Sequence, residues 1–456
     1  MRIAPMDQRL SPWRTCLLLT LAALAIRLAV MAFLYDDVLR TGRAPNWNFG
    51  YEQGRIASAL VQGKGFSNPL WAETGPTAWQ PPVYPYLLAG IFKLFGIFTR
   101  ASAIVAVGLN CLLSALTCIP LYYFTLRSFG RPAAAVAGSL WVIFPYSVYW
   151  SIERVWDTWL TTLLLSVLFL VVLRLESSER RLEWAGFGLL TGFAALTNPA
   201  TLSVIPALGL WLVWRLRKNA RRWLIPVGVS VLCAAGVVAP WVLRNYLTFG
   251  KFIPIRDDLG FEFGVGNDGN YAREYDICNG PWRACSRGND AEWARFQTAG
   301  EIAYFGEKTQ QARTYILNHP GEYVLATLRR VADLWTDCWS ISPQQIRLEP
   351  LSPIVWTLCT ILSGFTLFGL WRAWRVDAWS AWPYAAVLLF YPIIYYLTHT
   401  GDWYRRPIDP FFVALAAYAW VTLYQEHLAK ERRPAMAVQP YLGRLSEESP
   451  QGEYEG

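Results

Sequence analysis

The sequence predicts an all-α membrane protein, a polytopic bundle of about ten spans with interfacial helices and a small, mainly helical extracytoplasmic segment. Three observations predict this fold class. Of the 456 residues, 54% are hydrophobic and only 16% are charged, whereas soluble domains carry about 25% charged residues. The mean hydropathy is +0.24. Aromatic residues, whose rings settle at membrane interfaces, make up 15% of the chain.

Ten apolar segments approach the roughly 20 residues that a helix needs to cross the hydrocarbon layer. The first is too long for the core of a signal peptide, and no small-residue cleavage site follows it. The fifth and sixth are short and meet at Asn198-Pro199, where the chain must turn or break. The predicted spans are residues 15–35, 102–126, 133–150, 157–174, 184–197, 199–215, 223–243, 352–373, 378–398 and 407–425.

Basic residues orient these spans, because short loops rich in Lys and Arg stay on the cytoplasmic side. Ten spans with both termini inside place five basic clusters on that side. The clusters are Arg127 with Arg131, Arg174 with Arg180 and Arg181, the run from Arg215 to Arg222, Arg372 with Arg375, and Lys430 to Arg433. Because the net charge of +8 lies in such short clusters, we expect no nucleic-acid partner.

Residues 82–98 are apolar enough to be counted as a further span, but doing so would move Arg127 and Arg131 to the outer side. We therefore predict a helix that lies at the outer interface or dips into it. An ordinary span is the alternative.

The predicted topology divides the chain into four parts. They are the N-terminal transmembrane core 1–244 with its outer loop 36–101, the extracytoplasmic segment 245–345, the C-terminal transmembrane helices 346–425, and a cytoplasmic tail 426–456. The tail is polar and is expected to be disordered. Helical apolar spacing across residues 290–336, interrupted at His319-Pro320-Gly321, predicts helices in the extracytoplasmic segment.

Cysteine and histidine residues give little sign of a metal site, because no CxxC or HExxH occurs and the three His residues lie far apart. Cys278 and Cys285 flank a turn-rich stretch on the predicted outer side, where thiols can be oxidised. We predict a disulfide between them, with Cys338 left free; three unpaired cysteines are the alternative.

Charged residues collect on the predicted outer side and flank several spans. They are Asp36, Asp37, Glu52, Glu73, Glu153, Asp157, Arg244, Arg256, Asp257, Asp258, Asp402, Arg405 and Arg406. Acids and arginines gathered at a membrane interface would suit an enzyme that acts on a lipid phosphate, and they would also suit the gate of a transporter.

Four motifs in order resemble segments of the GT-C glycosyltransferases, which include the protein O-mannosyltransferases and the lipid A aminoarabinose transferases. The first is Tyr51-Glu-Gln-Gly-Arg-Ile-Ala-Ser-Ala-Leu-Val-Gln-Gly-Lys-Gly-Phe66, followed by Pro81-Pro-Val-Tyr-Pro85. The others are Ser151-Ile-Glu-Arg-Val-Trp-Asp-Thr158, Pro240-Trp-Val-Leu-Arg-Asn-Tyr246 continuing to Gly266-Asn267, and Tyr404-Arg-Arg-Pro-Ile-Asp-Pro410. They are most similar to the uncharacterised bacterial branch, and the resemblance covers most of residues 15–425.

This resemblance implies a glycosyltransferase at the outer face of the plasma membrane, with a polyprenyl-phosphate sugar donor and a protein, lipid or glycan acceptor. Cations must stabilise the departing phosphate, and a carboxylate must deprotonate the acceptor hydroxyl in an inverting displacement. The implied catalytic residues are Glu52 and Asp157, and the implied substrate-binding residues are Glu153, Arg244, Arg405 and Arg406. The cofactor is unknown; the sequence requires none, and a divalent cation (Mg or Mn) is one option.

Each of these residues has a simpler alternative. Glu52 could be a solvated carboxylate that pairs with Arg55, and the positions where many members carry an acid are occupied here by Phe49 and Gly50. Asp157 could be a helix N-terminal acid, or it could orient the acceptor or help to hold a divalent ion. Asp36 and Asp37 are reserve candidates for the base.

The arginines also have two interpretations. Arg405 and Arg406 could bind the donor phosphate, because the guanidinium fork fits phosphate oxygens, or they could extend toward lipid headgroups. Arg27 lies inside the first span and could be a structural partner or a phosphate contact. We expect Glu52 and Asp157 to face one cavity with Arg405 or Arg406 on its wall.

Three rival functional classes stay open from the sequence. A polysaccharide polymerase or ligase would use a pyrophosphate-linked donor. A secondary transporter would carry its charges near the midplane and would show inverted repeats. A catalytically silent scaffold would share the topology and tolerate the loss of Glu52 and Asp157.

Overall fold

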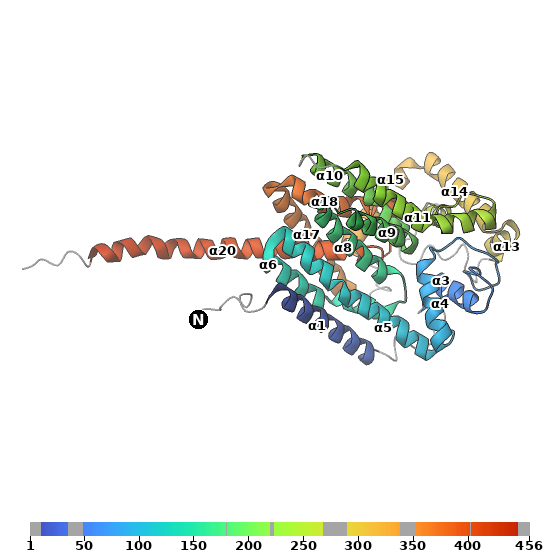
Figure 1. The fold of residues 1–456 in the computed structure, drawn as a ribbon, viewed down its shortest axis with the longest axis horizontal. Helices are drawn as coiled ribbons and strands as arrows, with labels where there is room; N and C mark the ends of the chain where they lie inside the picture. Colours follow the sequence, from blue (N-terminus) through green and yellow to red (C-terminus); the bar gives the residue numbers. More distant parts are fainter. Residues whose placement is uncertain are drawn as a thin grey trace, which may run out of the picture.

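The computed structural model describes residues 11–34, 49–178, 180–218, 223–267, 290–337, 352–401 and 403–445. Within these ranges the chain is helical, and the only extended pairing is an isolated bridge between Ser67 and Pro76. The predicted all-α, polytopic fold is therefore confirmed. The long apolar helices form one bundle, whereas α3, α4, α13 and α14 gather at the end opposite to the protruding part of α20 (Figure 1).

The helices of the bundle follow the predicted spans closely. They are α1 (Pro12–Phe33), α5 (Arg100–Leu116), α6 (Cys118–Ile143), α7 (Pro145–Glu153), α8 (Thr158–Leu175), α9 (Arg181–Thr197), η3 (Pro199–Ser203), α10 (Ile205–Lys218), α11 (Leu224–Phe249), α17 (Ser352–Val376), α18 (Ala378–Phe390), α19 (Ile393–Leu397), η5 (Arg406–Ile408) and α20 (Asp409–Leu445). Among the described residues, eight helical stretches are long and apolar enough to cross a membrane.

One of these eight stretches, Arg100–Ile143, has 44 residues, which is enough for two crossings. The chain leaves helical geometry at Gly130, whose φ is 85°. Ala115 shares a buried cluster with Val142, and Tyr122 shares another with Ala134. The chain therefore folds back near Gly130, between the second and third predicted spans.

The remaining helices form the predicted outer parts. They are α3 (Tyr51–Val61), α4 (Val83–Phe95), α12 (Leu259–Gly266), α13 (Asp290–Ala299), α14 (Glu301–Asn318) and α15 (Pro320–Thr336). The predicted helix at residues 82–98 is α4; its 13 residues span about 20 Å, which is too short to cross the hydrocarbon layer. The predicted break at His319-Pro320 separates α14 from α15.

The predicted inner loops meet at one end of the bundle, as the orientation from basic residues requires. A cavity of about 220 Å³ is lined there by Arg127, Glu176 and Asp377. Glu176 pairs with Arg215, and Arg372 pairs with Glu426. Arg127, Arg215 and Arg372 come from three of the basic clusters, and Glu176 lies beside Arg174 of a fourth. These four of the five clusters therefore lie at a common end.

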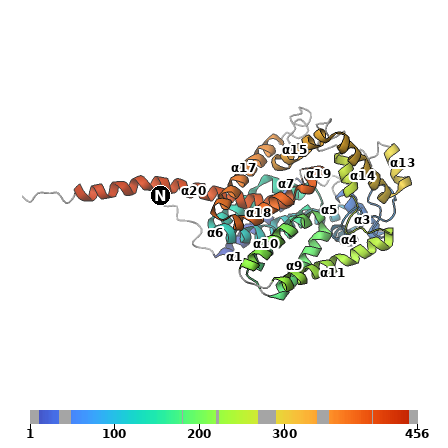
Figure 2. The ribbon, with the colours of Figure 1, turned by 90° about the horizontal axis from the view of Figure 1, so that it is seen from above.

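The predicted disorder of the tail from Glu426 is wrong for its first part, because α20 continues to Leu445 and extends beyond the bundle (Figure 2). The physical reason lies in the composition, since residues 425–433 are rich in Glu, Lys, Arg, Leu and Ala, which are strong helix formers.

Arg27 fixes the first span to its neighbours. Its guanidinium is fully buried and donates to the Ser114 Oγ at 2.9 Å, and to the Trp141 O and the Ser147 Oγ at 3.1 Å each. These partners belong to α5, α6 and α7, so a single side chain joins four helices. Of the two interpretations of Arg27, the structural one accounts for its contacts.

We expect Arg27→Ala to lower the stability of the bundle by about 3 kcal/mol or more, because it leaves buried hydroxyl and carbonyl groups without donors and opens a cavity. Thermal unfolding in detergent measures the effect. Arg14→Ala, which removes an exposed arginine from the same helix, is the matched control. Equal melting temperatures for the two variants would contradict the structural role.

Candidate functional site

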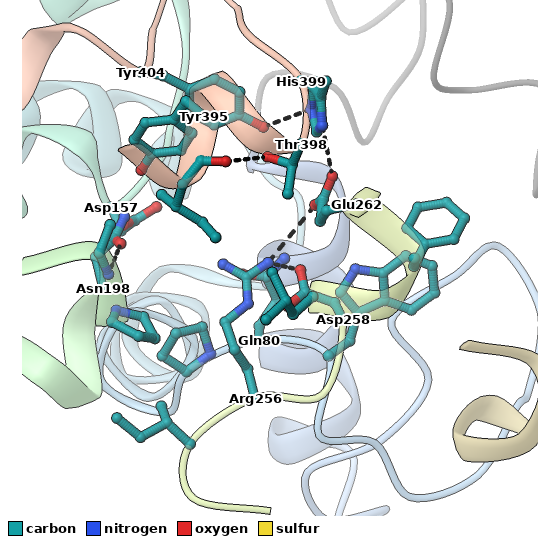
Figure 3. A pocket seen from close by; sticks show the side chains of 18 of the residues that line it. Gln80, Asp157, Asn198, Arg256, Asp258, Glu262, Tyr395, Thr398, His399 and Tyr404 are labelled. Carbon is teal, nitrogen blue, oxygen red and sulfur yellow. Dashed lines mark hydrogen bonds and ion pairs between the residues drawn. The ribbon is translucent and has the colours of Figure 1, made fainter. Parts of the chain in front are cut away.

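A cavity of about 450 Å³ lies where the predicted outer connections meet. Its lining comes from six segments that are distant in sequence: α3, the loop before α4, the start of α8, η3, the connection from α11 into α12, and the region from α19 to η5. Glu52 and Asp157 both line it, which agrees with the expectation that they share one cavity. Figure 3 shows the polar side chains pointing toward a common space.

Gly50 determines how the first and second outer connections pack. It has φ of +69°, and a Cβ at this position would lie 2.3 Å from the carbonyl oxygen of Val155. No side chain fits there, so the acid that many GT-C members carry near this point has no counterpart at Gly50. The close approach sets the start of α3 against the residues that precede α8, and it brings Glu52 toward Asp157.

Asp157 joins three segments through its carboxylate. The Gln53 Nε2 donates to one oxygen at 3.0 Å, and the Asn198 Nδ2 and the Thr161 Oγ1 donate to the other at 2.9 and 3.1 Å. The side chain caps no backbone amide of α8. Burial raises the pKa of Asp157, and the Gln53, Asn198 and Thr161 hydrogen bonds oppose that rise. Its arrangement is that of a positioning residue.

Glu52 differs from Asp157 because it is left open to a ligand. Its side chain is buried, with 4% exposure, and Oε2 has no hydrogen-bond partner among the described residues. Burial raises the pKa of Glu52 to about 8, which Glu262 reinforces and Arg256 opposes. A buried carboxyl with a free oxygen and a pKa near neutrality suits a general base.

A chain of charged and polar groups forms the opposite wall. Arg256 pairs with Asp258, and it lies 3.7 Å from Glu262. The His399 Nδ1 lies 3.1 Å from the other oxygen of Glu262, and its Nε2 lies 3.0 Å from the Tyr404 hydroxyl. Burial lowers the pKa of His399, so the ring is neutral at pH 7 and can accept a hydrogen bond from Tyr404.

The sequence interpretation missed most of this wall. The sequence predicts Arg256 and Asp258 only as charges on the outer side. It does not predict Glu262 or His399 as site residues. A usable signal was the position of His399, at the outer end of an apolar segment close to the fourth motif.

Aromatic rings complete the cavity. The Tyr395 and Tyr404 rings stack with centroids 4.3 Å apart, and Trp79, Trp156 and Trp403 also line the space. Arg154 lies over the Trp403 ring, 4.5 Å from its centroid. Flat apolar surfaces beside carboxylates and amides can bind a ring that is apolar on its faces and hydroxylated at its edges.

The expectation that Arg405 or Arg406 lies on the cavity wall is wrong. Both are fully buried behind it. Arg405 and Arg406 each lie 2.7 Å from one carboxylate oxygen of Asp409, and Arg406 also lies 3.2 Å from Asp337. Charges removed from water require such pairing, and these arginines have it within the protein.

Arg244 and Glu153 are also placed differently from the prediction, since neither lines the cavity. Arg244 donates to the carbonyl oxygens of Thr77 and Phe66 at 2.8 and 2.9 Å, so it holds the first outer loop against α11. Glu153 ends α7, whereas Asp157 precedes α8. The two acids therefore do not share one helix face, because Arg154 between them is extended.

Several predictions concern residues outside the described ranges: Asp36, Asp37, Asp402, Cys338, and the Cys278–Cys285 disulfide.

No group of three or more His, Cys, Asp or Glu side chains is arranged to hold a metal among the described residues. Protein donors occupy both oxygens of Asp157, and Arg256 engages Asp258 and Glu262. This donor set among the described residues does not fit a divalent ion, and the cation stays a prediction.

The comparisons with known proteins agree with this architecture. A family model described as dolichyl-phosphate-mannose-protein mannosyltransferase matches residues 79–243. No curated protein sequence matches the chain. The chain is similar to the apo oligosaccharyltransferase of Archaeoglobus fulgidus, with 12% identity, a TM-score of 0.55, and coverage of 94% of this chain and 52% of that one.

Two further solved structures are similar. The same archaeal enzyme, in complex with an inhibitory peptide and a dolichol-phosphate, has 14% identity and a TM-score of 0.55, with 99% of this chain and 53% of that one covered. ArnT from Cupriavidus metallidurans bound to undecaprenyl phosphate has 14% identity and a TM-score of 0.36, with 87% and 77% covered. The chain thus spans about half the length of the archaeal enzyme.

The fold is that of the GT-C membrane glycosyltransferases, so the resemblance inferred from the four motifs is confirmed at the level of the fold. The chain is a multi-pass membrane protein.

Because burial raises the pKa of Glu52 from 4.5 to about 8, the folded protein binds this proton more tightly than the unfolded chain. Ionisation of Glu52 therefore lowers the stability of the fold. This loss of stability is absent below pH about 4.5, grows as the unfolded chain ionises, and is constant above pH about 8. Glu52→Gln removes it and is therefore expected to melt at a higher temperature than the wild type, with a gap that widens between these pH values.

Thermal unfolding in detergent from pH 4 to pH 9 measures this gap. Glu73→Gln, which removes an exposed acid of the same loop that pairs with Lys64, should melt no higher than the wild type at any pH. A gap for Glu52→Gln that does not change with pH would show that the Glu52 carboxyl is solvated.

Proposed function

We propose that this protein is a membrane glycosyltransferase that moves a sugar from a polyprenyl-phosphate donor to an acceptor hydroxyl at the outer face of the plasma membrane. One observation carries the proposal: the buried Glu52 carboxyl has an unpartnered oxygen inside an aromatic cavity at the predicted outer ends of the spans. The family match and the fold support this class of reaction.

The charges of the cavity favour a neutral sugar inside it. The described lining holds four carboxyl groups, from Glu52, Asp157, Asp258 and Glu262, and a single guanidinium, from Arg256. A phosphate placed between these carboxyls would be repelled, which leaves the partly exposed Arg256 as its contact, whereas sugar hydroxyls can donate to the carboxyls. The volume of about 450 Å³ lies within the range of small-molecule sites. One guanidinium also suits a monophosphate better than a pyrophosphate.

Apolar side chains from two candidate spans border this cavity. Leu202 in η3 and Ile394 in α19 line it, and both helices belong to candidate spans. Leu202 and the neighbouring residues Ile393 and Leu397 are exposed apolar side chains. An isoprenoid tail could therefore stay in lipid while the sugar occupies the cavity. The archaeal structure with dolichol-phosphate shows that a protein of this fold accommodates a lipid phosphate.

Arg256 is the side chain best placed for the donor phosphate. It is partly exposed, and its Nε has no hydrogen-bond partner among the described residues. Phosphate binding would exchange one of its carboxylate contacts for a phosphate oxygen, and the guanidinium would stabilise the charge that builds up on the leaving group.

The proposed step is an inverting displacement. The acceptor hydroxyl gives its proton to the Glu52 carboxylate, and its oxygen forms a bond to the anomeric carbon from the face opposite to the phosphate. The bond between the anomeric carbon and the phosphate oxygen breaks, and its electron pair stays on the phosphate. Asp157 holds Gln53, and with it the start of α3, so that the neighbouring Glu52 keeps its place.

The test uses the full chain in proteoliposomes with a radiolabelled mannosyl-phosphate polyprenol and an extract of cell-envelope acceptors. Glu52→Gln should lower the transfer rate by about 10²- to 10⁴-fold, the range for loss of a general base. The wild-type kcat/KM should rise with pH up to about 8, because the carboxyl must be ionised to accept the proton. Glu73→Gln should keep both the rate and the pH profile.

Other outcomes would contradict the proposal. Solute uptake into the same vesicles without sugar transfer would indicate a transporter. Transfer from a pyrophosphate-linked oligosaccharide alone would indicate a ligase. Full activity of Glu52→Gln would remove Glu52 as the base.

Arg256→Gln is expected to raise the KM for the lipid donor and lower kcat, because the phosphate loses its charged contact in the ground state and in the transition state. Inhibition by free polyprenyl phosphate should weaken at least tenfold. Arg313→Gln is the matched control, since that arginine is exposed on α14 and does not line the cavity. Unchanged inhibition of Arg256→Gln would place the phosphate elsewhere.

A further inference from the structure

Helix α15 carries an apolar stripe that is open to its surroundings. Val324, Leu325 and Leu328 are exposed by 56, 49 and 61%, and Ala332 continues the stripe one turn later. These positions recur with helical spacing and lie on one face. Of the charged residues of α15, Arg330 and Asp333 are buried, and Glu322 and Arg329 are half-buried. A helix surrounded by water would be expected to carry polar side chains on this face.

The other face of α15 is fixed to the bundle near the cavity. Arg330 is fully buried and donates to the carbonyl oxygens of Tyr396 and Leu397 at 3.2 and 3.3 Å, and to the Asn267 Oδ1 at 3.0 Å. Figure 2 shows α15 between α17 and α14. The helix is thus a fixed part of the fold, and its apolar stripe faces away from it.

The C-terminal end of α15 packs against α17 well inside the membrane. The Ser363 Oγ donates to the carbonyl oxygen of Trp335. Ser363 lies ten residues into the candidate span Pro353–Val376, which corresponds to about 15 Å at 1.5 Å per residue.

A second span gives a similar depth. The Trp335 ring lies 5.0 Å from the Phe412 ring. The adjacent Phe411 ring lies 4.9 Å from that of Phe169, which is eleven residues, or about 16 Å, into the span Thr158–Leu175. Phe412 itself lies six residues, or about 9 Å, into the span Arg406–Glu431. Because the hydrocarbon layer is about 30 Å thick, these contacts place the end of α15 within its outer half.

From these depths and the apolar stripe we propose that α15 enters the outer leaflet, with Val324, Leu325, Leu328 and Ala332 in contact with lipid acyl chains. The helix dips into the membrane from the side on which α17 begins, and its 17 residues span only about 25 Å, so it does not cross. The sequence pattern placed it outside because Arg329, Arg330 and Asp333 lower its hydropathy. In the structure, the side chains of Arg330 and Asp333 are buried against the rest of the protein.

Site-specific fluorescence quenching tests this placement. Single cysteines replace Val324, Leu328 and Ala332, with Gln311, an exposed residue of α14, as the aqueous control. The parent carries serine at Cys233, Cys278, Cys285 and Cys338, since the other four cysteines are buried. Each variant is labelled with bimane in detergent and reconstituted into phosphatidylcholine vesicles.

Labels on α15 should be quenched several-fold more by lipids with acyl-chain nitroxides than by aqueous iodide, and the Gln311→Cys label should show the reverse. The deepest nitroxide should act most strongly at position 332 and least at position 324. Quenching of all three α15 labels by iodide would place the helix in water. Protection from both quenchers would mean that protein covers the stripe. Three α15 positions keep the test decisive if one variant misfolds.

Discussion

The carboxylate of Asp157 is the junction on which the candidate site depends. A buried carboxylate is costly unless donors satisfy it, and its donors come from α3, from α8 and from the residue before η3. The requirement to satisfy one charge therefore holds together three segments that are distant in sequence. The cavity lies beside this junction, and the loop before α4, the connection into α12 and the region from α19 to η5 complete its lining. Because Gln53 is held by Asp157, the neighbouring residue Glu52 has a fixed position on the cavity wall.

The Glu52 carboxyl differs from that of Asp157, because one of its oxygens has no partner among the described residues. Native proteins leave few buried polar atoms unpaired, and such atoms call for an explanation. The Glu52 Oε2 is one of them, although Gln53 beside it is used to bond Asp157. The same burial that raises the pKa of Glu52 makes its ionised carboxylate destabilising to the fold. Contact with a ligand accounts for the presence of a glutamate at this position. The neutral His399 and the chain from Arg256 to Tyr404 complete a wall that offers both donors and acceptors.

The sequence could predict the helical segments, because span length and basic clusters are local properties, and it could predict that Glu52 and Asp157 share a cavity, because both lie in outer connections. It misplaced Arg405 and Arg406, since one of their partners, Asp337, lies in another helix's terminal turn, although Asp409 one turn away was a local hint. The contact between Glu262 and His399 could not be predicted, because it joins α12 to the residues after α19, and the position of His399 near the fourth motif was its only local signal. The role of Gly50 was likewise invisible, because only the approach of the Val155 carbonyl excludes a side chain.

The arginines show why the contacts of a guanidinium within the protein, rather than its charge alone, identify a ligand-binding residue in a membrane protein. An arginine inside the bilayer is often interpreted as functional. Here Arg27 and Arg330 are bound by carbonyl and other neutral oxygens, and Arg405 and Arg406 are bound by Asp409. All four are fully buried, and their donors are directed at the protein itself. Arg256 differs, because it lines the cavity and stays partly exposed. Access to the cavity therefore distinguishes a guanidinium that can bind a phosphate from those that hold helices together.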